Sequence, residues 1–79
     1  MPKPLPIKNH IRRLRFEHGE MTQAELAEKI GMTRQTVAAI EKAKYSPSLE
    51  AAFRIARVFG VGLDDVFAWT ENGEGASDA

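Results

Sequence analysis

The chain contains no cysteine and no long hydrophobic run. Without cysteine, neither a disulfide framework nor a cysteine zinc site is available, so packing alone must hold the 79 residues together as one small domain. No apolar stretch approaches the roughly 20 residues of a membrane span, and the opening MPKPLPIKNH lacks the apolar core of a secretory signal. These absences predict a cytoplasmic protein with no membrane partner.

The chain also lacks a net charge, since 11 Lys and Arg balance 11 Asp and Glu. That balance at first argues against a nucleic-acid partner, because phosphate binding usually goes with a basic excess. The sum hides an asymmetry. Residues 1–44 carry nine Lys/Arg against five Asp/Glu, a net of +4, whereas residues 45–79 carry two against six, a net of −4. Such a chain can present one positive face, although solvated surface charge without a partner would give the same pattern.

The N-terminal segment predicts an arm followed by a helix. Three prolines among residues 1–6 block a helix and predict a flexible N-terminal arm. Ile7, Ile11 and Leu14 then recur at helical spacing with charged residues between them. This spacing predicts a first helix that starts near Ile7 and ends at the HG of residues 18–19, where glycine tolerates a left-handed cap.

Two short helices joined by a tight turn are predicted next. The TQAE that begins at Thr22 reads as a capping box, which starts a second helix, and Gly31 ends that helix. Thr33 is a further N-cap candidate and predicts a third helix over residues 34–42. Only Gly31 and Met32 separate the second helix from the third, whose N-cap candidate is Thr33.

The second half predicts two more helices and a tail. Either Ser46 or Ser48 caps a fourth helix that runs to Phe59, and LDDVF at residues 63–67 predicts a short fifth helix with Leu63, Val66 and Phe67 inward. Residues 70–79 have no apolar anchor and predict a disordered acidic tail. The fourth helix is apolar on two nearly opposite sides, which predicts cover on both: Leu49, Ala52, Phe53, Ala56 and Phe59 on one, and Ala51, Ile55 and Val58 on the other. The expected fold is a compact all-α domain of five helices over residues 7–69.

The second and third helices carry the functional pattern. A helix, a tight turn through glycine and another helix within about 20 residues is the helix-turn-helix layout, whose second helix lies in the DNA major groove. On the third helix, Val37 and Ile40 face the core, although any antiparallel helix pair can use such residues. The opposite face is polar or slim, so Gln35 can pair with adenine and Arg34 can grip guanine or a phosphate. The predicted DNA-binding residues are Gln23, Thr33, Arg34, Gln35, Thr36, Ala38, Ala39, Lys42 and Lys44.

The run MTQAELAEKIGMTRQTVAAIEKAKYSPSLEAAFRIARVFGV resembles the Cro/C1-type domain of phage repressors and Xre-like bacterial regulators. The resemblance covers nearly all of residues 7–67. It implies five helices that bind operator DNA, usually as a dimer, with Gln23 as a phosphate contact and residues 33–35 as base readers. It also implies that Arg15 pairs with Glu41, which fixes the first helix against the third. Three departures stand out: Ala43 replaces a usual glycine, Glu20 lengthens a loop, and Ala38 stands where relatives often have asparagine.

These features predict a sequence-specific DNA-binding transcriptional regulator that acts as a repressor and whose partner is double-stranded operator DNA. A homodimer is expected, because one domain of this size offers few phosphate contacts. Its candidate surface is Val66, Phe67 and Trp69, unless the fifth helix folds back within one chain. Catalysis, a metal, a cofactor and a small-molecule ligand are not expected, since the histidines and acidic residues show no ligand or nucleophile spacing. The alternative is an antitoxin-type or other protein-interaction module with the same fold.

Overall fold

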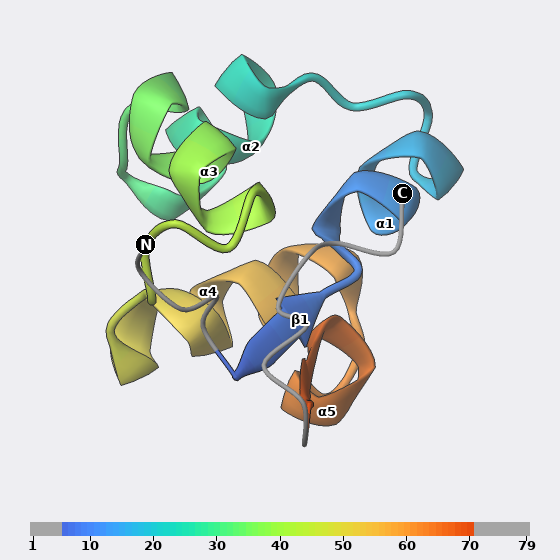
Figure 1. Ribbon diagram of the computed structural model, residues 1–79. Helices are drawn as coiled ribbons and strands as arrows, with labels where there is room; N and C mark the ends of the chain where they lie inside the picture. The colour runs from blue at the N-terminus through green and yellow to red at the C-terminus, as the bar shows by residue number, and fades with distance from the viewer. Residues whose placement is uncertain (1–5, 71–79) are drawn as a thin grey trace.

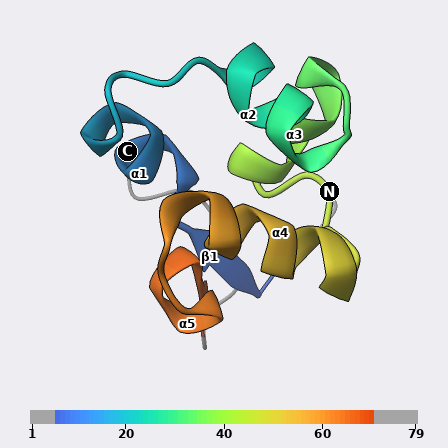
Figure 2. The ribbon, with the colours of Figure 1, turned by 180° about the vertical axis from the view of Figure 1, so that it is seen from behind.

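The computed structural model describes residues 6–70, which form five helices and one small sheet. The elements are β1 (Ile7–Asn9), α1 (Ile11–Glu17), α2 (Gln23–Ile30), α3 (Arg34–Glu41), α4 (Leu49–Phe59), α5 (Leu63–Val66) and β2 (Phe67–Trp69). The α2–α3 pair lies at one end of the molecule, α4 packs against α2 and α5, and the sheet lies with α5 at the other end (Figure 1, Figure 2). The all-α, five-helix prediction is confirmed, with the two-stranded sheet as a minor addition.

A single hydrophobic core joins all five helices. Its members are the inward residues of helical patterns, and the largest of them are almost fully shielded from solvent. Burial of each such side chain is worth about 1.5–3 kcal/mol, so this cluster is the main source of stability in a chain without disulfides. The core consists of Ile11, Leu14, Leu26, Ala27, Ile30, Val37, Ile40, Ile55, Ala56, Phe59 and Val66.

Side-chain caps set the starts of the three central helices. At α2, Glu25 N donates to Thr22 Oγ1 at 3.0 Å and Thr22 N donates to Glu25 Oε1 at 2.8 Å, which completes the capping box. The bond from the Thr22 backbone also holds the pKa of the Glu25 carboxyl below its ordinary value. Thr33 caps α3 through a bond from Thr36 N at 3.2 Å. At α4 the cap is Ser48, whose hydroxyl accepts from Ala51 N at 3.1 Å; this settles the choice between Ser46 and Ser48.

The predicted start of the first helix at Ile7 is wrong. Ile7 lies in β1, which pairs antiparallel with β2 so that Ile7 faces Trp69, and α1 begins only at Ile11. The pairing satisfies backbone groups that a helix would otherwise use, and His10 N donates to Val66 O at 2.8 Å at its end. Helical spacing included Ile7 because it precedes Ile11 by four positions, but its half-buried side chain lines surface hollows of the sheet and is not a member of the core.

The last predicted helix is also shorter than expected, because Phe67 belongs to β2 and only Leu63–Val66 is helical. On α4, Leu49 and Phe53 are 69% and 49% exposed, so nothing within residues 6–70 supplies the predicted cover at these two positions. The predicted flexible arm and acidic tail fall outside the described residues, apart from their innermost members. Thr70 N donates to Pro6 O at 2.7 Å, which continues the strand pairing by one step.

Ala43 occupies a backbone conformation that favours glycine. Its φ is +58°, and the chain there closes a Schellman motif in which Ala43 N donates to Ile40 O at 3.0 Å and Lys44 N to Ala39 O at 2.9 Å. A left-handed non-glycine residue costs roughly 1–2 kcal/mol, of which glycine's larger unfolded-state entropy offsets about half. We expect Ala43→Gly to raise the free energy of unfolding by about 0.5–1 kcal/mol in urea denaturation. A loss of stability would show that the Ala43 methyl packs better than the strain costs.

Candidate nucleic-acid interface

The turn between α2 and α3 spans only three residues, and its chemistry fixes the angle between the helices. Gly31 ends α2 with φ +73°, in the left-handed region. A Cβ built at Gly31 would lie 3.5 Å from Arg54 Nη1, which in turn donates to Ile30 O at 3.3 Å. Met32 packs on the core and Thr33 caps α3. The turn therefore leaves the first residues of α3 projecting beyond α2.

The predicted reading residues lie on the side of α3 that faces away from the core. Val37 and Ile40 are 1% and 2% exposed, whereas Arg34 and Gln35 are exposed. Ala38 and Ala39 are half-buried and keep the middle of this face slim. Thr33 and Thr36 border it, with their hydroxyl oxygens 3.0 Å apart. The face has long polar side chains at its N-terminal end and little bulk behind them, a shape that allows close approach to a groove.

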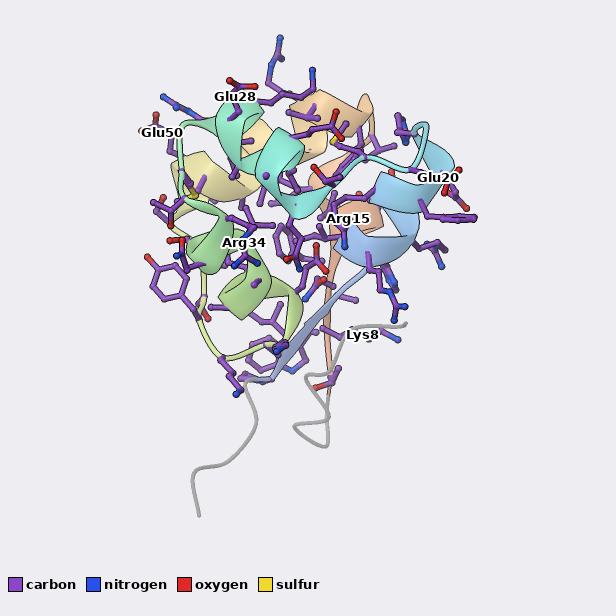
Figure 3. All side chains as sticks on the ribbon, turned by 90° about the horizontal axis from the view of Figure 1, so that it is seen from above. Lys8, Arg15, Glu20, Glu28, Arg34 and Glu50 are labelled. Atoms are coloured by element: carbon purple, nitrogen blue, oxygen red, sulfur yellow. The ribbon has the colours of Figure 1, made fainter. Side chains whose placement is uncertain are left out.

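Basic side chains continue this face past the end of α3. Lys42 and Lys44 are both exposed, on either side of the Ala43 turn. Figure 3 shows the labelled cations Arg34, Arg15 and Lys8 along one part of the molecule and the labelled anions Glu28 and Glu50 along another, with the labelled Glu20 beside α1 on the Arg15 side. The exposed cations Arg34, Lys42 and Lys44 therefore lie on the outward side of α3 and in the turn that follows it.

A partly buried ion pair ties α1 to the end of α3. Arg15 Nε donates to Glu41 Oε2 at 2.6 Å and Arg15 Nη2 donates to Glu41 Oε1 at 3.1 Å, so the contact is bidentate. Arg15 Nη1 also donates to Met21 O at 2.8 Å, and Gln23 Nε2 donates to Glu41 Oε1 at 3.3 Å. The two charged side chains are only 16% and 7% exposed. This network fixes α1, the start of α2 and the end of α3 relative to one another.

The comparisons with known proteins agree with this geometry. A family model described as helix-turn-helix matches residues 11–66, which include all five helices. Uncharacterized HTH-type transcriptional regulators of Methanothermobacter thermautotrophicus and Methanocaldococcus jannaschii are 53% and 47% identical to this chain, over 85% and 84% of it and 97% and 98% of their own lengths. The chain belongs to the helix-turn-helix family of transcriptional regulators. A third relative, the uncharacterized HTH-type regulator YgzD of Bacillus subtilis, is 48% identical over 82% of this chain and 96% of its own length.

The fold of this helix-turn-helix regulator also occurs in a crystal structure. A protein from Bacteroides fragilis, described there as a candidate DNA-binding protein, superposes with a TM-score of 0.68 and covers 78% of this chain and 98% of its own. At 22% identity this likeness concerns the fold alone. Within residues 6–70, no helix has the length and apolarity to cross a membrane. In the same part of the chain, no three His, Asp or Glu side chains gather as a group that could hold a metal ion.

Asn9 is a buried polar residue of the helix-turn-helix domain that the sequence did not reveal. It is 2% exposed, and its Nδ2 donates to Ile40 O at 2.9 Å and to Glu41 O at 3.3 Å. Its Oδ1 accepts from Ile11 N at 3.2 Å. One side chain in β1 thus serves the end of α3 and the start of α1. No spacing rule links an asparagine to carbonyls some 30 positions away, although the bond to Ile11 is a local capping pattern.

Tyr45 is a second residue that the sequence did not single out. It lies just beyond the Schellman turn, is 48% exposed, and borders the same hollow as Gln35, Thr36 and Ala39. Its position in the sequence could have indicated it, because Tyr45 directly follows Lys44, a predicted DNA-binding residue, where the chain turns back at the end of α3. The loop after α3 therefore adds an aromatic side chain to the face formed by α3.

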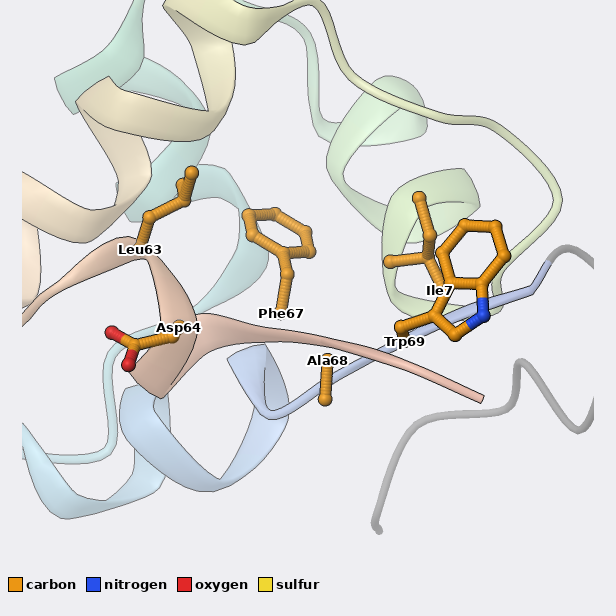
Figure 4. A pocket seen from close by; sticks show the side chains of 6 residues that line it. All are labelled: Ile7, Leu63, Asp64, Phe67, Ala68 and Trp69. Carbon is orange, nitrogen blue, oxygen red and sulfur yellow. The ribbon is translucent and has the colours of Figure 1, made fainter. Parts of the chain in front are cut away.

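The predicted dimer surface needs one correction. Val66 is 0% exposed and belongs to the core of its own chain, because α5 folds back onto α4. Phe67 is half-buried and Trp69 is 66% exposed. They line an open hollow of about 410 Å³, and Figure 4 shows the Trp69 ring beside Ile7 at one end, Leu63 at the other and Phe67 between them. Without Val66, the candidate dimer surface is this apolar hollow, formed by the sheet and α5.

Proposed function

We propose that the chain is a sequence-specific DNA-binding transcriptional repressor that reads the major groove with α3 and occupies its operator as a homodimer. The observation that supports this best is the outward face of α3. Its exposed N-terminal residues project past a three-residue turn, on a helix anchored by Val37, Ile40 and Glu41. A rigid support of this kind lets a helix present base-reading side chains without a large ordering cost on binding.

Each residue of the face has an expected task. Gln35 pairs with an adenine edge and Arg34 with guanine or a phosphate. Lys42 and Lys44 neutralise backbone phosphates, and Gln23 adds a phosphate contact from the start of α2, where free N–H groups favour an anion. The bond from Gln23 Nε2 to Glu41 uses one of its two amide protons, which leaves the other for such a contact. Thr33 and Thr36 border the face, and Ala38 and Ala39 allow the helix to approach closely.

A homodimer would use the hollow beside Trp69. In a two-fold arrangement each copy presents the same patch, so an exposed Trp69 next to an apolar hollow can insert into the hollow of the partner. Two copies would double the number of phosphate contacts and read two half-sites about one helical turn (~34 Å) apart. β1 touches the end of α3 through Asn9. Among the described residues, however, none of those proposed to contact DNA lines the hollow beside Trp69, so this contact would leave the outward residues of α3 free in each copy.

Selection of binding sites from a random DNA pool at two salt concentrations tests the proposal. Recovery of an inverted repeat would support specific reading by a symmetric dimer, and the repeat would give the half-site spacing. The salt series separates specific binding from phosphate attraction, which weakens steeply as salt rises. Recovery of no motif would contradict sequence-specific reading and would favour a protein partner for the fold instead.

Gln35→Ala and Lys44→Ala are expected to differ in kind. Loss of a bidentate base contact should weaken binding to the selected site by about 1–3 kcal/mol and relax the preference at one position. Loss of Lys44 should weaken binding to selected and random DNA alike and should lower the slope of affinity against salt by about one. Titrations of both variants on both DNAs, at several salt concentrations, measure the difference. Equal, sequence-independent losses for the two variants would refute base reading by Gln35.

A further inference from the structure

A hollow on the α3 face is not explained by the direct base and phosphate contacts above. Gln35, Thr36, Ala39 and Tyr45 line it, and its volume is about 210 Å³. Gln35 and Ala39 come from the outward side of α3, while Tyr45 comes from the loop that follows the helix. The hollow therefore opens on the surface that the proposed function places against DNA.

The backbone after α3 puts the Tyr45 ring at this place. Because Ala43 is left-handed and Lys44 N returns to Ala39 O, the chain reverses directly at the end of the helix. Tyr45 then lies beside the preceding turn of α3, next to Ala39 and Thr36. Nearly half of the Tyr45 surface stays exposed.

The lining of the hollow suits a ligand with a small apolar group next to a polar atom. The Ala39 and Thr36 methyl groups and the Tyr45 ring supply apolar walls, and the Gln35 amide supplies a donor and an acceptor at the rim. Within residues 6–70, no Lys or Arg lines the hollow, although Arg34, Lys42 and Lys44 lie elsewhere on the face. A phosphate would need cations or several donors, so it fits this lining poorly.

We propose that this hollow receives the 5-methyl group of a thymine and that Tyr45 is a specificity-determining residue. The proposal rests on the proposed function, because it needs α3 in the major groove. Thymine is the one standard base that presents a methyl group there, and its O4 acceptor lies beside that methyl. A methyl group held between Ala39 and the Tyr45 ring brings O4 toward the rim, where the second amide proton of Gln35, the one that a bidentate adenine contact leaves unused, is a donor. Arg34 lies on the other flank of the helix, so the two flanks would read different base pairs.

Deoxyuridine provides the test, because uracil keeps O4 and lacks only the methyl group. Each thymine of the selected site is replaced singly by deoxyuridine, and the affinity of the intact chain is measured for each DNA. In each half-site, replacement at one thymine position should weaken binding about fourfold, and replacement at the others should not. One buried methyl group is worth about 0.8 kcal/mol, and 1.4 kcal/mol corresponds to a factor of ten in affinity. Tyr45→Ala should bind the thymine and uracil DNAs with equal affinity at that position, while Tyr45→Phe should keep the difference.

Phe16→Ala is the matched control, because Phe16 is an exposed aromatic residue on α1, 68% exposed and outside the hollow. It should leave both the affinity and the uracil effect unchanged. The proposal is overturned if no thymine occurs in the selected half-site, if no uracil replacement weakens binding, or if the uracil effect persists in Tyr45→Ala. A uniform loss on all DNAs in Tyr45→Ala, without a uracil effect, would assign the ring to the DNA backbone. Failure of the proposed function is a different result, since wild-type protein would then select no site at all.

Discussion

Arg15→Met is expected to lower the free energy of unfolding by about 3–5 kcal/mol, a large part of the 5–15 kcal/mol typical of a domain. The reason is the Glu41 carboxylate, which is 7% exposed and would keep Gln23 as its one side-chain partner among the described residues. Met21 O would also lose its donor. A buried charge without its counterion costs far more than the pair itself contributes, so removal of one partner is the severe change. Urea denaturation of the variant and the parent measures the loss.

The double variant Arg15→Met, Glu41→Leu separates the cost of an orphaned charge from the value of the pair. Replacement of both charges by apolar side chains of similar size is often nearly neutral, so the double variant should return to within about 1.5 kcal/mol of the parent. Arg12→Met is the control, because Arg12 is an exposed cation on the same helix and should change stability by no more than about 0.5 kcal/mol. If the double variant is even less stable than Arg15→Met, then the attraction between the two charges itself stabilises the fold. In that case the loss in Arg15→Met would not be due to an unpaired buried charge.

The sequence predicted those parts of the fold that local rules determine. The capping box at Thr22, the cap at Thr33 and the glycine end of α2 depend on residues within four positions of one another, and all three are present. The inward residues of α2 and α3 followed from helical spacing. The contact between Arg15 and Glu41, 26 positions apart, came from the resemblance to the Cro/C1-type family and is seen in the structure. Of the candidate DNA-binding residues, the structure gives positions and exposure, while their roles stay predictions.

The parts that escaped prediction depend on contacts between the two ends of the described chain. β1 and β2 are three residues each, and they pair across nearly the whole domain. Three residues are too few for the alternating apolar pattern by which a strand is predicted from sequence. Ile7 fits a helical pattern and a strand equally well. Val66 was predicted to face inward on the fifth helix and also to belong to a candidate dimer surface, with fold-back of that helix left open. The structure shows the fold-back, which buries Val66 and removes it from the dimer surface. Phe53 shows the opposite error, since an apolar position on a helix need not be covered.

Asn9→Ala is expected to lower the free energy of unfolding by about 2–4 kcal/mol, because each buried group left without a partner costs about 1–3 kcal/mol. The variant removes the donor shared by Ile40 O and Glu41 O and the acceptor for Ile11 N. Ile40 O keeps Ala43 N as a partner, so the uncompensated groups are chiefly the Glu41 carbonyl and the Ile11 N–H. The end of the reading helix would thus lose its fixed contact with the sheet.

Asn9→Asp distinguishes the two halves of this role, because an ionised carboxylate can still accept from Ile11 N but cannot donate to carbonyls. It should be at least as destabilising as Asn9→Ala at neutral pH, since it places a negative charge against two carbonyl oxygens. Lys8→Ala controls for the strand itself, because Lys8 is the neighbouring residue of β1 and its side chain points to the other face. Urea denaturation of the three variants decides the matter. If Asn9→Ala lowers the free energy of unfolding no more than Lys8→Ala does, then water replaces the amide. The hydrogen bonds from β1 to the end of α3 would then contribute nothing to stability.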